Sequence, residues 1–498
     1  MPSFKLKSSW VTILQGVEFS IFPLILAWAL QQCSATALPV MSSNEFQALM
    51  TRFEKKLLSR TDSTRLYSLA QCPRVRLTVR RMKNVSASTQ TSLLSVVSVV
   101  RLLITLYWRT DFNLTDVNNY RAIALSNVDT KIFERLLVSK TNERKSEGDK
   151  YQFGFKSGHS TSMCAGAVKK VINYYTSNGS HVFACFVDLT KAFDRLNYWI
   201  LFSQLLSDGM DVNLVKLLAY WYANQSVAVR WQNTISESFR VSNGTKQGGV
   251  LSPFFFNRYI MELLRDVSLS NAGCIIGNMP TNIFAYADDI VLLTPSWYAM
   301  QQLLTVLDKY CDMLHLCCNI KKSVCMVFDP KDKSKVVCDN FPCFMLNGKP
   351  LQFVSEFLYL GHVISRSLSD DRDIQREIRN MYIRTNTLIR RFGKCSKKVK
   401  IRLFRSYCVC LYGTALCLYG TALWKTYTCS SIRKFRSCYH KCMKMFFGYH
   451  RMCSVTAILL ELQLSSFDTL LHNYRYSFHM QWKSSDNAVV KHFISIGL

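Results

Sequence analysis

Two adjacent carboxylates, Asp288 and Asp289, interrupt an otherwise apolar stretch of this 498-residue chain. Residues 282–287 before them are mostly apolar or β-favouring, and residues 290–293 form a second apolar run. Short β-rich runs broken by two residues predict a tight hairpin, here with both acids at its tip. Ionised carboxylates beside so much apolar surface destabilise a fold unless a cation pairs with them. The pattern is compatible with a solvated turn or with a metal site.

A third carboxylate, Asp188, ends another apolar run. Residues 182–187 read V-F-A-C-F-V, and Asp188 follows directly, 100 residues before Asp288. A run of this kind predicts a buried strand with an acid at its end.

The net charge of +29, from 62 lysines and arginines against 33 acidic residues, calls for a polyanionic partner. Nucleic acid is the first candidate, an anionic membrane surface is the second, and a basic protein without such a partner is the third. A hydrophobic content of 49% excludes a disordered chain.

The 19 cysteines sit singly in apolar runs or in irregular pairs and form no repeated C-x-x-C framework. We therefore expect reduced thiols in an intracellular protein.

Near the N-terminus, two lysines, an apolar stretch at 21–30 and the triplet Ala35-Thr36-Ala37 resemble a signal peptide. A fortuitous N-terminus is the alternative, and Glu18 and Pro23 make the stretch a poor transmembrane helix.

Several strings carry a resemblance to one family. The Y-A-D-D run at 286–289 resembles the palm active site of reverse transcriptases. The F-V-D-L-T-K-A-F-D string at 186–194 resembles the first catalytic motif of non-LTR (LINE-type) retrotransposon reverse transcriptases. The K-Q-G-G-V-L-S-P string at 246–253 closely matches the family's K-Q-G-x-x-L-S-P motif.

Other segments are similar to further motifs of that family. Residues 118–123 and 151–161 resemble the two fingers motifs, although Ala122 stands in place of a proline. Residues 319–323 resemble the palm motif N-x-x-K-T/S, and residues 355–364 resemble the primer-grip hairpin. Together these resemblances run from residue 118 to about residue 471.

The resemblance implies an α+β right-hand polymerase fold, with fingers, a palm built on an antiparallel sheet, a thumb and a helical C-terminal region. The expected domains are a poorly assigned N-terminal region at 1–110 with the signal-like segment 1–37, fingers and palm at 111–365, and thumb and C-terminal helices at 366–498. The implied activity is an RNA-directed DNA polymerase that transfers nucleotides to a primer 3′-hydroxyl by a two-metal mechanism.

The resemblance also implies roles for residues. Asp188, Asp288 and Asp289 are expected to hold two Mg²⁺ ions, or Mn²⁺ in their place, and Lys322 to protonate the departing pyrophosphate. Arg121 is expected to meet the triphosphate, and Phe193 to reject a 2′-hydroxyl. The remaining nucleotide-binding candidates are Gln247, Gly248 and Tyr286, and the template- or primer-binding candidates are Lys156, Gly158, Leu360 and Gly361.

The expected partners are an RNA template, a DNA primer or target, and deoxynucleoside triphosphates, without a stable membrane partner and in the cytoplasm or nucleus. Elements of this family usually carry an endonuclease upstream, and no motif for one is recognised here, so a truncated element or partial gene model is expected. The segment C-L-Y-G-T-A-L occurs twice in tandem, at 410–416 and 417–423. This duplication and the altered fingers motifs favour the alternative of an inactive, nucleic-acid-binding remnant. The signal-like N-terminus favours the alternative of a secreted protein.

Overall fold

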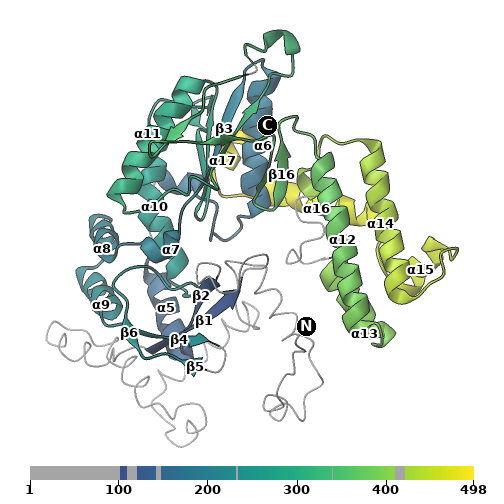
Figure 1. Cartoon of the computed structure of the whole chain (residues 1–498), viewed down its shortest axis with the longest axis horizontal. Helices are drawn as coiled ribbons and strands as arrows, with labels where there is room; N and C mark the ends of the chain where they lie inside the picture. Colours follow the sequence, from purple (N-terminus) through teal and green to yellow (C-terminus); the bar gives the residue numbers. More distant parts are fainter. Residues whose placement is uncertain (1–100, 109–119, 142–146, 232–233, 339, 410–420) are drawn as a thin grey trace, which may run out of the picture. The chain divides into compact units, whose positions relative to one another are not determined.

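The computed structural model describes residues 101–108, 120–141, 147–231, 234–338, 340–409 and 421–498 (Figure 1). The chain divides into two compact units, one of residues 1–125 and 228–238 and one of residues 126–227 and 239–498. The signal-like segment, the first copy of the heptapeptide repeat and most of the second copy lie outside the described residues.

The first unit contains a small antiparallel sheet. Strands β1 (Arg101–Trp108) and β2 (Tyr120–Leu125) pair with Tyr107 opposite Arg121. The order β2-β1-β4-β5 is completed by β4 (Ser226–Trp231), which begins in the second unit, and β5 (Thr234–Ile235). The edge of one ring packs against the face of the other in the pair Tyr120 and Trp231, whose centroids are 4.7 Å apart. The sequence patterns did not identify β1.

The second unit is built on a five-stranded sheet in the order β14-β11-β3-β10-β9. All neighbouring strands of this sheet are antiparallel except β11 and β14, which are parallel. The apolar run before Asp188 is the central strand, and it is buried along almost its whole length because helices α6, α10 and α11 pack against the sheet. The strands are β3 (Val182–Asp188), β9 (Ile283–Tyr286), β10 (Asp289–Thr294), β11 (Val324–Phe328) and β14 (Gln352–Phe353).

The helices of the second unit between residues 126 and 313 have recognisable caps and apolar faces. Ser160 caps α6 through the backbone N–H of Met163, and Pro253 lies in the first turn of α10, where its missing N–H costs no hydrogen bond. Met300, Leu303, Leu304, Leu307 and Cys311 recur at helical spacing and form the buried face of α11. The helices are α5 (Val128–Thr141), α6 (Thr161–Ser177), α7 (Ala192–Arg195), α8 (Tyr198–Ser207), α9 (Val212–Ala223), α10 (Ser252–Ser268) and α11 (Trp297–Met313).

Short elements connect these parts. They are the 3₁₀ helices η5 (Glu147–Tyr151), η6 (Lys333–Lys335) and η8 (Thr421–Leu423), the π-helix η7 (Arg405–Val409), and the strands β6 (Phe239–Arg240), β7 (Ile275–Ile276), β8 (Met279–Pro280), β12 (Met345–Leu346) and β13 (Lys349–Pro350).

A hairpin of β15 (Glu356–Tyr359) and β16 (His362–Ser365) leads into the helical C-terminal region. Helix α12 has acids in its first turn and arginines in its last, which suits the helix dipole. It packs along α14 (Figure 1). The helices are α12 (Asp371–Phe392), α13 (Lys397–Phe404), α14 (Cys429–Phe447), α15 (Val455–Leu462), α16 (Phe467–Lys483) and α17 (Ala488–Ser495). In the described part of the chain, no helix has the length and apolar character needed to cross a membrane.

Candidate active site

The sheet register places Asp289 of β10 directly opposite Asp188 of β3. Directly opposite residues of antiparallel strands have side chains on the same face, with Cβ atoms roughly 4.5–5.5 Å apart. Asp188 and Asp288 are half-buried, and Asp289 is exposed. The two strand ends therefore meet, although Asp289, and not the expected Asp288, lies directly opposite Asp188.

The turn between β9 and β10 differs by one residue from the expected one. Ala287 and Asp288 form the turn, whereas Asp289 already belongs to β10 and pairs with Tyr286. The prediction that both acids lie at the tip is therefore wrong for Asp289. Ala287 adopts a left-handed conformation with φ of +58°, which a two-residue hairpin turn requires and which alanine rarely adopts.

Gln152 holds this strained turn in place. Its side-chain Oε1 accepts a hydrogen bond from the Ala287 N–H at 2.8 Å, and its Nε2 donates to the Ala287 carbonyl at 3.2 Å. The neighbouring Phe153 N–H donates to the Ala285 carbonyl. A Cβ on Gly154 would lie 2.4 Å from the Ala287 nitrogen, so only glycine fits there. The second fingers motif thus supports the carboxylate hairpin, a role that the sequence did not suggest.

The N-x-x-K-S segment packs behind Asp188. The Asp188 N–H donates to the buried Ser323 hydroxyl at 3.1 Å, and the Asn319 N–H donates to the Asp188 carbonyl at 2.8 Å. The segment therefore fixes both main-chain polar groups of Asp188. Lys322, the predicted general acid, is the exposed neighbour of Ser323.

Phe193 lies on α7, immediately after the Asp188 strand. Its ring stacks on Phe256 of α10 with centroids 4.5 Å apart and meets the edge of Phe155 at 6.0 Å. These two contacts fix the ring while it stays half-buried. The ring is therefore fixed by two aromatic neighbours and partly exposed, five residues after Asp188 in the chain.

The K-Q-G-G loop packs against α7. The Thr245 N–H donates to the Phe193 carbonyl, and Gly244 approaches the Asp194 backbone too closely for a Cβ. The Gln247 amide donates to Asp194 at 3.4 Å. Burial raises the pKa of Asp194. Gly248 is exposed, with φ of +100°, so this loop places Gln247 and Gly248 beside the segment that carries Phe193.

Lys246, in the same loop, has a structural role that the sequence analysis missed. Its ammonium lies 3.3 Å from the fully buried Glu134 of α5 and 4.5 Å from the centroid of the Trp221 ring. Burial lowers the pKa of Lys246. The other Glu134 oxygen accepts from the Val250 N–H at 2.6 Å. Both residues are visible in the sequence, Glu134 in the 128–141 helix and Lys246 in the K-Q-G-G string, but only tertiary packing brings them together.

The predicted primer-grip hairpin turns at Leu360 and Gly361, which both have positive φ. Arg376 of α12 donates to the Gly361 carbonyl at 2.6 Å, and Asp373 accepts from the Val363 N–H at 3.0 Å. His362 is buried between Asp370 and Asp373, at 3.4 and 3.0 Å. Although burial opposes ionisation, His362 and Arg376 hold the pKa of Asp373 well below its usual range. The start of α12 therefore fixes the turn.

The structure also places three further residues that were predicted to bind template, primer or nucleotide. Lys156 pairs with Asp149 at 2.6 Å. Gly158 has φ of +75° and its carbonyl accepts from Gln481 of α16. Arg121 lies on β2 in the first unit. Their roles remain predictions.

The acids offer the hard oxygen ligands that Mg²⁺ prefers. The cross-strand pair Asp188 and Asp289, with Asp288 next to it, is a donor set that suits such ions, each of which would keep several waters. Within the described ranges, no three acidic, histidine or cysteine side chains already form a metal-binding group.

The family model described as "Reverse transcriptase (RNA-dependent DNA polymerase)" matches residues 112–364, about half of the chain. An RNA-directed DNA polymerase from the mobile element jockey of Drosophila funebris is 26% identical over 322 residues, covering 60% of this chain and 34% of that protein. A Pol polyprotein from the R2DM retrotransposable element of Drosophila melanogaster is 28% identical over 249 residues, covering 49% and 23%. The chain spans about a third or less of the length of these relatives.

Among solved structures, the apo telomerase of Candida tropicalis matches with a TM-score of 0.42 and 11% identity, covering 79% of this chain and 63% of that one. A telomerase of Candida albicans matches with a TM-score of 0.41 and 11% identity, covering 78% and 69%. Likeness at this level carries no argument about function.

The family match spans the segment that contains both catalytic motifs, and the antiparallel sheet there joins Asp188 to the Tyr286–Asp289 hairpin. The predicted α+β class, with a largely antiparallel sheet and a helical C-terminal region, is confirmed. The chain belongs to the reverse transcriptase (RNA-dependent DNA polymerase) family.

Proposed function

We propose that this chain is the RNA-directed DNA polymerase of a non-LTR retrotransposon. It would copy an RNA template by adding deoxynucleotides to the 3′-hydroxyl of a DNA primer or target. The observation that carries this proposal is the register of the central sheet, which sets Asp188 opposite Asp289 inside the segment that matches the family.

In this proposal Asp188, Asp288 and Asp289 hold two divalent ions, Mg²⁺ or Mn²⁺. Such ions, when bound, lower the pKa of the primer hydroxyl and neutralise the leaving pyrophosphate. The protein's part is to fix the carboxylates: the Ser323 hydroxyl and the Asn319 N–H fix the Asp188 backbone, and Gln152 fixes the turn that carries Asp288. Lys322, exposed beside Ser323, would protonate the departing pyrophosphate.

The nucleotide would lie beside α7 and the K-Q-G-G loop. Phe193, fixed by Phe256, would leave no room for a 2′-hydroxyl. Gln247 would offer an amide to the sugar or base, and the exposed backbone of Gly248 would allow close approach. Tyr286 precedes the turn and would border the sugar, and Arg121 is proposed for the triphosphate because its guanidinium matches phosphate oxygens.

Template and primer would meet the fingers motif and the hairpin turn. Leu360 and Gly361 form that turn, and Arg376 and Asp373 of α12 hold it. Lys156 would exchange its contact with Asp149 for a template phosphate, and Gly158 would let the backbone approach the strand. The proposed division is fingers and palm at 111–365 and thumb with C-terminal helices at 366–498, and the proposed location is the cytoplasm or nucleus.

A primer-extension assay tests the proposal. The full chain would be mixed with an RNA template, an annealed labelled DNA primer, deoxynucleotides and Mg²⁺. We expect primer extension that ends at the template 5′ end and stops when EDTA is added. A chain that binds the duplex but extends no primer on RNA with either Mg²⁺ or Mn²⁺ would contradict the proposed activity and support a binding remnant.

A further inference from the structure

The carboxylate of Glu134 contacts both ends of the K-Q-G-G-V segment at residues 246–250. Glu134 lies on α5 and is fully buried. One of its oxygens lies 3.3 Å from the Lys246 ammonium, and the other accepts a hydrogen bond from the Val250 N–H at 2.6 Å. These two partners flank residues 247–249 in the chain. A single side chain therefore holds both ends of the segment that carries two of the proposed nucleotide-binding residues.

The segment between these two ends is a tight turn. The Gly249 N–H donates to the Lys246 carbonyl at 2.9 Å, which closes a four-residue turn. Gly248 occupies the third position with φ of +100°, a conformation that favours glycine. Lys246 and Gly249 are buried, whereas Gln247 is half-buried and Gly248 is exposed. The turn is therefore fixed at its first and last residues and leaves its two central residues accessible to a ligand.

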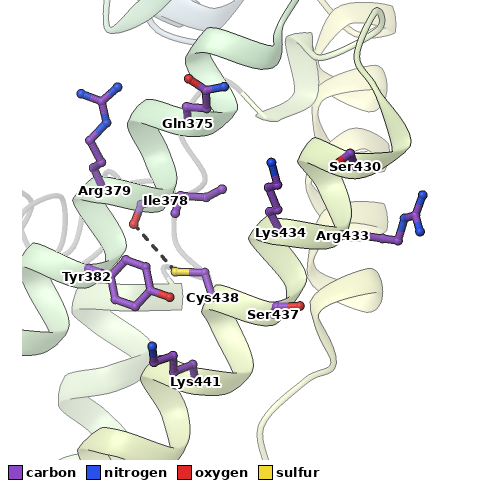
Figure 2. Close-up of a pocket in the computed structure, with 10 residues that line it drawn as sticks. All are labelled: Gln375, Ile378, Arg379, Tyr382, Ser430, Arg433, Lys434, Ser437, Cys438 and Lys441. Carbon is purple, nitrogen blue, oxygen red and sulfur yellow. Dashed lines mark hydrogen bonds between the residues drawn. The ribbon is translucent and has the colours of Figure 1, made fainter.

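Lys246 is enclosed and does not face solvent. Its ammonium lies 4.5 Å and 5.7 Å from the centroids of the Trp221 and Tyr222 rings, and its side chain is 5% exposed. Lysine side chains normally reach solvent, as the exposed Lys434 does where it extends from α14 into the space beside α12 (Figure 2). Because Lys246 is surrounded by a carboxylate and two aromatic rings, its effect on a ligand must pass through the backbone of the turn.

Stability alone does not explain the buried pair. A buried ion pair often stabilises a fold no more than apolar residues of the same volume would. An apolar residue at position 134 would, however, leave the Val250 N–H without this acceptor. That N–H lies just before α10, whose N-cap residue, Leu251, makes no side-chain capping hydrogen bond. The acceptor that Glu134 supplies from α5 therefore fixes the junction between the turn and α10.

We propose that Glu134 is a positioning residue for the incoming deoxynucleotide, because it fixes the turn that carries Gln247 and Gly248. The inference rests on the proposed function for the identity of the ligand. Glu134 is fully buried, so it acts through the Val250 N–H and Lys246 and does not touch the nucleotide itself. Loss of the Val250 contact should therefore weaken nucleotide binding and leave duplex binding unchanged.

The test compares two double variants that differ in one hydrogen-bond acceptor. Both carry Lys246→Met, and the second change is Glu134→Gln in one and Glu134→Leu in the other, so neither contains the buried charges. Only the glutamine retains an oxygen that can accept from the Val250 N–H. Circular dichroism and urea denaturation check that both variants fold.

Fluorescence anisotropy would measure the affinity for a labelled deoxynucleotide complementary to the next template base. The RNA template is annealed to a DNA primer that ends in a dideoxynucleotide, and Mg²⁺ is present, so the nucleotide binds without being transferred. Duplex affinity is measured separately with a labelled primer.

We expect the leucine variant to bind the deoxynucleotide about tenfold more weakly than the glutamine variant, about what one buried hydrogen bond contributes. The two variants should bind the duplex equally. Equal nucleotide affinities would overturn the proposal, as would a loss of duplex affinity as large as the loss of nucleotide affinity.

Hydrogen exchange of the wild-type chain gives a second measurement that needs no variant. The peptide covering residues 245–251 should exchange more slowly when the deoxynucleotide joins the protein–duplex complex. Unchanged exchange on nucleotide binding would overturn the proposal even if the leucine variant does not fold.

The two proposals fail separately, because binding to a terminated primer requires no nucleotidyl transfer. A wild-type chain that binds the deoxynucleotide but extends no primer contradicts the proposed function and still allows the two variants to be compared. A chain that extends primers while both variants bind the nucleotide equally contradicts only the role of Glu134.

Discussion

The side-chain amide of Gln152 contacts both main-chain polar groups of Ala287, 135 residues later in the chain. Ala287 is the left-handed residue of the turn that carries Asp288. A turn strained in this way stays in place only when its surroundings fix it. The position of the turn that carries Asp288 therefore depends on a residue that belongs to a different motif.

Replacing Gln152 with alanine should lower the primer-extension rate constant more than it lowers duplex affinity. The variant leaves the N–H and carbonyl of Ala287 without these partners, which costs about 1–3 kcal/mol in a buried setting, and it frees the turn. We expect kcat to fall about tenfold, since small misplacements at a reaction centre cost this much or more.

Gln301 supplies a matched control for this variant. It makes the same two-bond contact, to the N–H and carbonyl of Met345, on the exposed side of α11. Gln301→Ala should leave kcat near wild type. Equal losses of kcat in both variants would show that the effect is general and not transmitted through the turn.

Replacing Phe193 with valine should admit ribonucleotides. The ring is stacked on Phe256 and half-exposed, so shortening it opens space toward the nucleotide without emptying a core position. We expect the preference for deoxynucleotides, measured as a ratio of kcat/KM values, to fall about tenfold or more. Phe155→Leu, which changes the other ring in contact with Phe193, should alter the ratio much less. An unchanged ratio for Phe193→Val would remove the filter role.

Breaking the buried pair of Lys246 and Glu134 should destabilise the protein. Lys246→Met leaves a buried carboxylate without its cation, which typically costs about 3–5 kcal/mol of unfolding free energy. Urea denaturation would measure the loss. The double variant Lys246→Met/Glu134→Leu should recover much of it, because no buried charge is left. A double variant as unstable as the single one would show that the Val250 N–H contact matters more than the charge.

Glu377 on α12 should make stability depend on pH. Burial raises its pKa to about 8, against the opposing charges of Arg376 and Arg384, and Asp373 adds to the rise. Because its pKa is raised above the unfolded value, its favourable contribution is complete below about pH 4.5 and is lost as pH rises toward 8. Glu377→Gln should therefore raise the melting temperature more at pH 9 than at pH 5. A larger gain at pH 5 would contradict this assignment.

Much of the fold could be predicted because local signals and the family motifs agreed. The apolar run before Asp188, the stripe of α11 and the serine cap of α6 each specify an element through short-range patterns. The strand β1 could not be predicted, since its pattern lacks a clear alternation and its pairing with β2 is tertiary.

The site was predicted in part. Two motifs predicted that residue 188 approaches the 288–289 pair. The sequence could not assign the turn to Ala287 and Asp288, because no local pattern indicates that an alanine adopts a positive φ. The roles of Gln152, Glu134 and the first turns of α12 depend on contacts between distant segments. No periodicity or spacing reports such contacts.

In the proposed mechanism, the acids joined by the β3–β10 register hold the catalytic ions. Single-turnover primer extension on RNA, followed over a range of Mg²⁺ concentrations, compares Asp188→Asn with Asp312→Asn, which changes an exposed acid of α11. We expect Asp188→Asn to lose at least about a thousandfold in rate, roughly 4 kcal/mol of transition-state stabilisation, while Asp312→Asn matches wild type. A wild-type rate in Asp188→Asn at every Mg²⁺ concentration would contradict it.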